Sequence, residues 1–360
     1  MGHGSYKASD WIKLKNSRGI NSSSNASEIF SSNLLNQKYD PKYITMRESC
    51  DSEDSPNSTP IILAFDVTGS MGYLAAEIAK NSLNKTILEL YDKNPVTNPH
   101  VMCAAITSPA EPNGALQVTQ FEADIRVVEQ LLELKVGFSG NRYSYDSLVW
   151  YFAAKHTSID SFNKRGKKGF LFTIGDEICG AHRGESLLAE EIRAVYGDDY
   201  NGGSISLAQV YSMAAEKYEI FHIVVKRESS AESWSDFLPG RVAYVSNIEY
   251  LCEAITSIMQ ITNGMSKDDV IAQWPDQSRN VVCSAVEKID LSQKTPVGFK
   301  APVNDPPKPT STQNSTRVNI NTPPYKSANT TNMPPKSPTD KSKPTTPLKK
   351  KSLIAKLLGK

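Results

Sequence analysis

Short apolar runs alternate along this chain with segments in which apolar residues recur at helical spacing. The first run, residues 61–67 (IILAFDV), is apolar almost throughout, which is typical of a strand buried on both faces of a sheet. Over residues 73–91 the apolar positions return every three or four residues and predict a helix. The same alternation continues to residue 261. It predicts strands over 100–106, 116–121, 169–174, 220–225 and 242–245, and helices over 123–134, 147–155, 206–218 and 248–261.

Strands that alternate with helices predict an α/β fold with a central, mostly parallel sheet and helices on both of its faces. We assign this domain to residues 58–262. Residues 1–57 are polar and rich in Ser and Asn, and we expect an N-terminal extension of loop, one short helix near 26–35 and a linker over 47–60. Residues 263–295 are expected to form a short helical C-terminal extension.

Residues 296–360 differ in composition from the rest of the chain. They are rich in Pro, Thr, Asn and Lys and cannot offset the entropy of ordering, so we predict a disordered tail. They carry 12 basic and 2 acidic residues, which leaves 28 basic and 37 acidic residues in the remainder. Any contact with nucleic acid or a membrane is therefore expected only through the tail. Its end, 348–360, fits either an anchoring helix or merely a basic tail.

The composition of the whole chain of 360 residues, with 39% hydrophobic and 22% charged residues, is typical of a soluble globular protein. The five cysteines are widely spaced and form no CxxC pair, so we expect free thiols rather than a disulfide framework or a zinc site. No secretory signal is recognisable, and no stretch approaches the roughly 20 apolar residues of a transmembrane segment. The expected location is the cytoplasm.

The segment Asp66-Val67-Thr68-Gly69-Ser70 follows the first predicted strand and carries the clearest chemistry. In parallel α/β sheets, ligands bind at the carboxyl ends of the strands. The spacing places one carboxylate and two hydroxyls on a single tight loop, and such hard oxygen donors suit Mg²⁺. The alternative is that Asp66 only caps its strand, because Asp, Thr and Ser side chains commonly form hydrogen bonds to nearby backbone in turns.

Two other segments are expected to contribute to the same site. Asp176 closes the predicted strand at 169–174, while we interpret its neighbour Glu177 as a solvated charge. The loop at 137–147 offers Ser139, Asn141 and Ser144 as oxygen donors.

These residues resemble a known family. Residues from about 60 to 261 resemble the von Willebrand factor A (vWA) domain, whose metal-ion-dependent adhesion site (MIDAS) contains an Asp-x-Ser-x-Ser motif, a Thr in a middle loop and a later Asp. Asp66 and Ser70 match the ends of the motif, Thr68 takes its middle position, and Asp176 matches the later Asp. Residues 137–147 contain no threonine, so Asn141, Ser139 or a water would have to complete the metal shell.

The resemblance implies a Rossmann-like vWA fold and protein–protein recognition that depends on Mg²⁺ or Mn²⁺, with no small-molecule cofactor. The ion would keep an open position that an acidic side chain of a protein partner fills. Gly69, Met71, Tyr143 and Tyr145 are the residues expected at the partner-binding face. Within the family the chain looks most similar to intracellular prokaryotic or phage-type members, some of which are linked to AAA+ ATPases, which implies an adaptor or assembly factor.

A phosphohydrolase and a nucleic-acid-binding protein are the two alternatives to a recognition module. A magnesium-dependent phosphohydrolase using Asp66 would need a second Asp two residues later, where Thr68 stands and cannot act as an acid or base near neutral pH. Nucleic-acid binding would rest on the basic tail. A P-loop is excluded because no Lys-Ser/Thr pair follows Gly72. We therefore expect a binding protein with no catalytic residue, and we interpret His222, within an apolar strand, as a core histidine.

Overall fold

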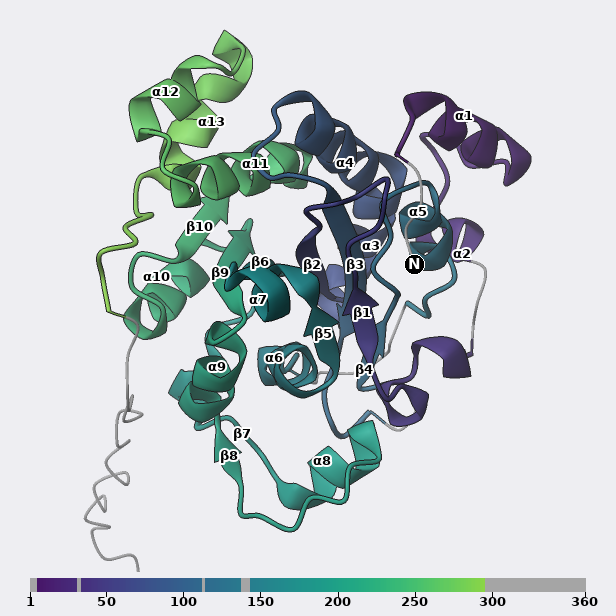
Figure 1. Cartoon of the computed structure of the whole chain (residues 1–360), viewed down its shortest axis with the longest axis vertical. Helices are drawn as coiled ribbons and strands as arrows, with labels where there is room; N and C mark the ends of the chain where they lie inside the picture. Colours follow the sequence, from purple (N-terminus) through teal and green to yellow (C-terminus); the bar gives the residue numbers. More distant parts are fainter. Residues whose placement is uncertain (1–4, 31–33, 112–113, 137–142, 295–360) are drawn as a thin grey trace, which may run out of the picture. The chain divides into compact units, whose positions relative to one another are not determined.

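A six-stranded sheet forms the centre of the computed structural model (Figure 1). The strand order is β10-β9-β6-β2-β3-β4, and all neighbours are parallel except β4, which is antiparallel to β3. The fold class expected from the sequence, a mostly parallel α/β sheet covered by helices, is thus confirmed. The strands are β2 (Thr59–Asp66), β3 (Pro99–Ile106), β4 (Leu116–Val118), β6 (Gly169–Gly175), β9 (Tyr218–Val225) and β10 (Val242–Val245).

The chain builds this sheet outward from β2 in two directions. After β2 it adds β3 and β4 on one side, and then it crosses to the other side of β2 to add β6, β9 and β10. The order reverses between β2 and β6. In doubly wound sheets, such a reversal leaves a crevice beyond the carboxyl ends of the two central strands, because the following loops diverge to opposite faces.

The two faces of the sheet have separate apolar cores. Ile61, Leu63 and Phe65 of β2 pack into one core, while Ile62 and Ala64 pack into the other, as the two-residue period of a strand requires. Figure 1 shows helices on both faces. The first core also includes residues of α4 (Leu83–Asp92), α5 (Arg126–Leu131) and α11 (Leu251–Thr262), and the second includes residues of α6 (Asp146–Lys155), α8 (Ala189–Tyr196), α9 (Leu207–Ala215) and α10 (Glu228–Phe237).

The structure describes residues 5–30, 34–111, 114–136 and 143–294, and all of them belong to one compact unit. The tail predicted to be disordered, 296–360, lies outside these ranges. In the described ranges, no helix combines the length and the apolar character needed to cross a membrane.

The N-terminal residues pack into the first core, although their polar composition predicts a separate extension. Helix α1 (Ala8–Ser17) carries Trp11, which is 5% exposed, and the short helix α2 (Ala26–Ile29) carries Ile29 and is followed by Phe30. All three side chains pack in the first core. Few apolar residues suffice here because each is large and nearly fully buried.

The linker expected over 47–60 also contains regular structure. Its first residues form β1 (Arg47–Ser49), which pairs in parallel with β5 (Thr157–Ile159). The C-terminal segment packs on the first core through α12 (Lys267–Ala272) and α13 (Asp276–Val286). The remaining elements are the 3-10 helices η1 (Gln37–Tyr39), η2 (Pro41–Tyr43), η3 (Gly69–Met71), η5 (Gly180–Arg183) and η6 (Ile248–Tyr250), the π-helical turn η4 (Ile78–Ser82), helices α3 (Gly72–Glu77) and α7 (Asp160–Arg165), and strands β7 (Ser186–Leu187) and β8 (Ile205–Ser206).

Truncation of Trp11 tests whether the N-terminal helix belongs to the cooperative unit. We expect Trp11→Ala to lower the free energy of unfolding by about 3 kcal/mol or more, because a large buried side chain is lost. Ile12 is the next residue of the same helix and is 57% exposed. Ile12→Ala should change stability by less than about 0.5 kcal/mol. Urea denaturation measures both values, and an equally small effect of the two substitutions would contradict the assignment.

Candidate functional site

Three carboxyl groups meet at the carboxyl ends of β2 and β6. Asp66 is the last residue of β2, and Asp176 follows Gly175, the last residue of β6. Since β2 and β6 pair directly, the two aspartates come together as the sequence predicted. Glu177 joins them, and Asp66, Asp176 and Glu177 each offer a carboxylate oxygen within 4.8 Å of the others. The strand reversal, where doubly wound sheets have their ligand-binding crevice, therefore carries a cluster of three acidic side chains in this protein.

Asp66 is held by hydroxyl groups from two different loops. Its Oδ1 accepts hydrogen bonds from the backbone N–H and from Oγ1 of Thr68, both at 2.7 Å. Its Oδ2 accepts a hydrogen bond from Ser144 Oγ at 3.0 Å. Thr68 and Ser144 are themselves buried, with 5% and 3% exposure. The loop after β2 and the loop before α6 are thus joined through one carboxylate.

Among the described residues of the middle loop, Ser144 is the one whose side chain contacts Asp66. The sequence offers Ser139, Asn141 and Ser144 as oxygen donors and predicts that Asn141 or Ser139 completes the metal shell. Both of these lie outside the described residues. Ser144 is positioned by its neighbour Tyr145, whose N–H donates to the carbonyl of Thr107 just beyond β3 at 3.0 Å.

The segment after Thr68 turns back toward the core. Gly69–Met71 form η3, and the N–H of Met71 donates to the carbonyl of Thr68 at 2.7 Å. Ser70, the remaining hydroxyl of the motif, belongs to this turn, and its side chain lies outside the part of the chain that the structure describes. Gly69 is exposed, but Met71 is only 1% exposed and packs in the first core. The prediction that Met71 faces a partner is wrong, because the 3-10 turn directs its side chain inward.

Helix α10 fixes the loop that carries Asp176 and Glu177. Ser230 Oγ donates to the carbonyl of Asp176 at 2.8 Å, and Trp234 Nε1 donates to the carbonyl of Glu177 at 3.0 Å. Arg227 Nη2 lies 3.6 Å from Asp176 Oδ2. Glu177 is half-buried rather than fully solvated, which corrects our interpretation of it as a simple strand-end charge.

Burial and the charges of neighbouring carboxylates raise the pKa values of Asp66 and Glu177. Burial raises the pKa of Asp66, hydrogen bonds from Thr68 and Ser144 oppose this, and the nearby charge of Asp176 adds to it. Burial also raises the pKa of Glu177, and the charge of Asp66 contributes to the increase. A bound cation would offset this concentration of negative charge.

A second acidic layer lies behind Asp66, at the start of α6. Asp146 is buried, and burial together with the charges of Glu185 and Asp66 raises its pKa well above the usual value. Glu185 Oε1 accepts a hydrogen bond from Ser147 Oγ at 2.5 Å, and burial raises the pKa of Glu185 to about 7. The sequence did not reveal this layer, because Asp146 looks like an ordinary helix-start carboxylate and Glu185 lies in a stretch without periodicity.

Arg183 connects the loops around the site. Its Nη2 donates to the carbonyl of Ser144 at 3.3 Å and lies 3.5 Å from Glu185 Oε2. Its guanidinium carbon lies 4.3 Å from the ring centroid of Tyr143, a cation–π contact. Tyr143 is 52% exposed at the rim, whereas Tyr145 is partly buried against the second core. Of the two tyrosines that we expected at a partner face, Tyr143 is therefore the more accessible.

His222 lies on β9 away from the acidic cluster. Its Nδ1 is 2.7 Å from Thr173 Oγ1, and its ring stacks on Trp234 with centroids 3.7 Å apart. Burial lowers the pKa of His222 to about 3, so the ring is neutral near physiological pH. This agrees with its interpretation as a core histidine.

Comparisons with known proteins give only distant likenesses. No family model and no curated protein matches this chain. Among solved structures, it is similar to the pilus adhesin SpaC from Lactobacillus rhamnosus GG in its open conformation, with a TM-score of 0.37 and 10% identity over 59% of this chain and 31% of the adhesin. It is also similar to a von Willebrand factor type A protein from Catenulispora acidiphila, with a TM-score of 0.32 and 13% identity over 58% of this chain and 44% of that chain.

A second form of the same adhesin gives a TM-score of 0.37 and 9% identity over 58% of this chain and 31% of that chain. The matched region thus spans less than half of each of these proteins. The fold class rests on the strand order and register of the sheet itself: a doubly wound α/β domain with an acidic cluster at its strand reversal.

The buried Glu185 gives the protein without metal a characteristic pH dependence. Its pKa is about 7 in the folded state against an ordinary 4.5. The folded state therefore holds the proton more tightly, and its stability falls as pH rises from about 4.5 to 7, by up to about 3 kcal/mol. Glu185→Gln removes the titrating group and keeps an acceptor for Ser147, so it should flatten this decline.

The exposed Glu190 supplies the control, since Glu190→Gln should leave the wild-type profile unchanged. Urea unfolding in EDTA across this pH range measures all three proteins. Parallel profiles for the wild type and Glu185→Gln would show that the buried carboxyl does not hold its proton.

Proposed function

We propose that this chain is a vWA-type recognition module in which Mg²⁺ or Mn²⁺ at the acidic crevice binds an acidic side chain of a protein partner. The observation that carries the proposal is the convergence on Asp66. One buried carboxylate is bonded by hydroxyls of two loops, and Asp176 and Glu177 lie within 4.8 Å of it. This arrangement stands at the strand reversal, where doubly wound sheets bind their ligands.

The donor set suits a hard divalent cation. The structure brings together three carboxylates and the hydroxyls of Thr68 and Ser144, and oxygen ligands of this kind favour Mg²⁺ and Mn²⁺ over softer metals. Asp66, Thr68 and Asp176 would hold the ion, with Ser70 from the same turn and Ser144 in the place expected for Asn141 or Ser139. The ion would supply a positive charge to which a partner carboxylate binds.

Recognition is a better interpretation than hydrolysis because of Thr68. A phosphohydrolase of the type considered above would use the residue two positions after Asp66 as its acid and base. Here that residue is Thr68, whose hydroxyl donates a hydrogen bond to Asp66 at 2.7 Å. The Thr68 side chain does not titrate near neutral pH and cannot act as an acid or a base. We therefore propose a binding role with no catalytic residue.

The five cysteines are consistent with action inside the cell. All five are free thiols, and three of them, Cys103, Cys179 and Cys252, are buried. Such thiols persist in a reducing compartment. We propose an adaptor or assembly factor in the cytoplasm, with an AAA+ ATPase as one candidate partner class.

Affinity capture from the native cell tests the recognition directly. The wild-type chain should retain a partner in Mg²⁺ and release it in EDTA. Asp66→Asn should capture none in either condition, since the isosteric amide removes the charge that holds the ion. Asp199→Asn, at an exposed aspartate, is the matched control and should behave like the wild type. Capture that is indifferent to EDTA and to Asp66→Asn would overturn the proposal.

A further inference from the structure

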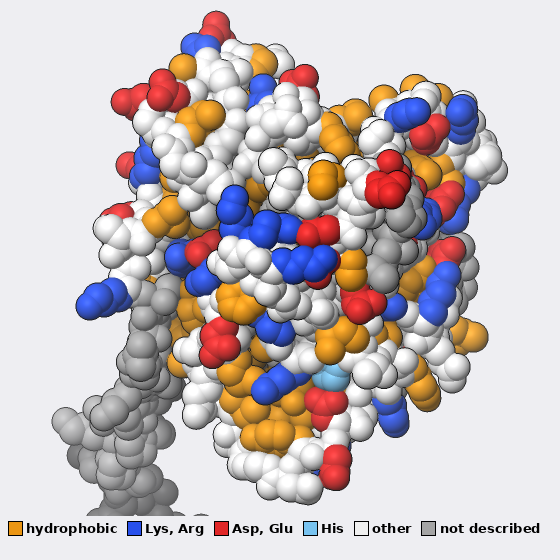
Figure 2. Space-filling model, in the orientation of Figure 1, with side chains coloured by type: hydrophobic (Ala, Val, Ile, Leu, Met, Phe, Trp, Pro, Cys, Tyr) orange, Lys and Arg blue, Asp and Glu red, His pale blue; other side chains and the backbone are white. Residues whose placement is uncertain are grey.

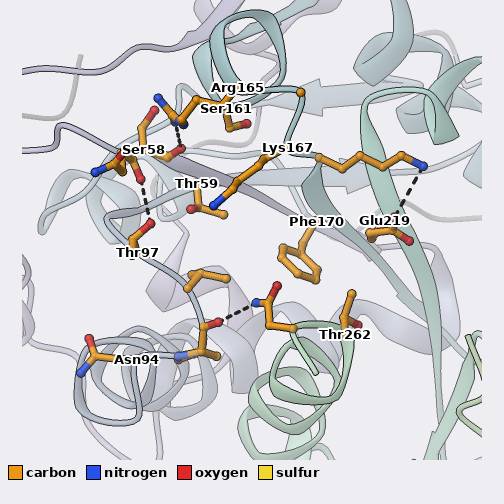
Figure 3. Close-up of a pocket in the computed structure, with 16 residues that line it drawn as sticks. Ser58, Thr59, Asn94, Thr97, Ser161, Arg165, Lys167, Phe170, Glu219 and Thr262 are labelled. Atoms are coloured by element: carbon orange, nitrogen blue, oxygen red, sulfur yellow. Dashed lines mark hydrogen bonds and ion pairs between the residues drawn. The ribbon is translucent and has the colours of Figure 1, made fainter. Parts of the chain in front are cut away.

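A cavity lies at the end of the sheet opposite to Asp66, where the parallel strands begin. It has a volume of about 800 Å³ and is lined by Thr59 of β2, Phe170 of β6 and Glu219 of β9 (Figure 3). Because β2 runs from Thr59 to Asp66, the cavity and the acidic crevice are separated by roughly 20 Å along the strand. A volume of this size suits a small organic ligand.

The lining of this cavity is basic. Arg165, Lys167 and Lys168 contribute three positive charges against the single negative charge of Glu219, a net of +2. Figure 2 shows Lys and Arg side chains gathered over the neighbouring helix α7. This edge of the sheet therefore has the opposite polarity to the acidic crevice, and it attracts anions.

Two of the three cations are already engaged. Arg165 pairs with Asp51 at 2.5 Å and donates to the carbonyl of Ser58 at 2.9 Å. Lys168 lies 3.5 Å from Glu219, a carboxylate that Arg241 also contacts at 2.6 Å.

Lys167 has no acidic partner among the described residues, and its ammonium group points across the cavity toward Thr59 (Figure 3). This charge is available to a ligand.

A buried hydroxyl beside Lys167 also lacks a partner. Ser161 lines the cavity and is 2% exposed, yet its Oγ makes no hydrogen bond within the described part of the chain. The carbonyl of Ser161 accepts the backbone N–H of Lys167 at 2.8 Å, so the two residues are held together. A buried hydroxyl left unpaired costs free energy. Ser161 Oγ is itself covered, and rotation of its side chain toward the cavity would bring the hydroxyl within reach of an acceptor oxygen of a ligand.

We propose that this cavity binds a small phosphate monoester, with the phosphate group held by Lys167 and Ser161. A phosphate offers three strong acceptor oxygens and about two negative charges, which match an ammonium and an unpaired hydroxyl donor from two residues that line one cavity. Thr59 and Thr97 add further hydroxyls to the lining, and the remaining volume accommodates the organic part of the ester. The proposal is independent of the metal site.

Titration calorimetry of the full chain with phenyl phosphate tests this site. The buffer contains EDTA, so that no ion at Asp66 contributes to binding. The wild type should bind phenyl phosphate. Lys167→Gln and Ser161→Ala should each weaken binding by about tenfold or more, because each removes a charge-assisted hydrogen bond. Inorganic phosphate, titrated in parallel, shows whether the organic part adds affinity and so distinguishes an ester from free phosphate as the ligand.

Two controls keep the result specific. Lys288 is an exposed lysine outside the cavity, and Lys288→Gln should bind phenyl phosphate like the wild type. Asp199→Asn, at an exposed aspartate outside the cavity lining, should also bind normally. Absence of binding by the wild type, or equal weakening by Lys288→Gln and Lys167→Gln, would overturn the proposal.

Discussion

A buried carboxylate at the end of the central strand β2 constrains the loops at the carboxyl ends of the parallel strands. Asp66 loses its water on folding, and its oxygens must then find donors within the protein. Thr68 supplies two of them and Ser144 supplies a third from a loop 78 residues away. The turn after β2 and the approach to α6 are shaped by this requirement, and the register of β6 against β2 brings Asp176 to the same place.

The parallel sheet separates charge along its strands. Its carboxyl edge carries Asp66, Asp176 and Glu177, with Asp146 and Glu185 buried behind them. Its amino edge carries a basic cavity. Because the central strands run in the same direction, the loops that follow them gather at one end of the sheet and the loops that precede them at the other, so an acidic cluster and a basic cavity lie at opposite strand ends.

The sequence predicted the parts of this arrangement that depend on local pattern. The run IILAFDV is typical of a strand buried on both faces, and β2 is such a strand and ends at Asp66. Helix α10 was missed because its sequence, ESSAESWSDF, is mostly polar, although Trp234 and Phe237 bury one face. Strand β1 was missed because Arg-Glu-Ser has no apolar alternation and is ordered by its pairing with β5.

Site residues that depend on tertiary contacts were harder to predict. Ser144 was one of three oxygen donors in its loop, and only the fold places its hydroxyl on Asp66. The sequence predicts that Met71 is exposed beside Gly69, but the turn directs its side chain into the core. Glu185 reaches the second acidic layer from a segment with no recognisable periodicity, so its role follows from packing alone.

Calorimetric titration of Mn²⁺ into the full-length chain measures whether Asp66 organises a divalent cation site. We expect one site that binds Mn²⁺ in the wild type and in Asp199→Asn, and no binding in Asp66→Asn although that variant unfolds at a similar temperature. Binding of Mn²⁺ by Asp66→Asn with wild-type affinity would contradict this expectation.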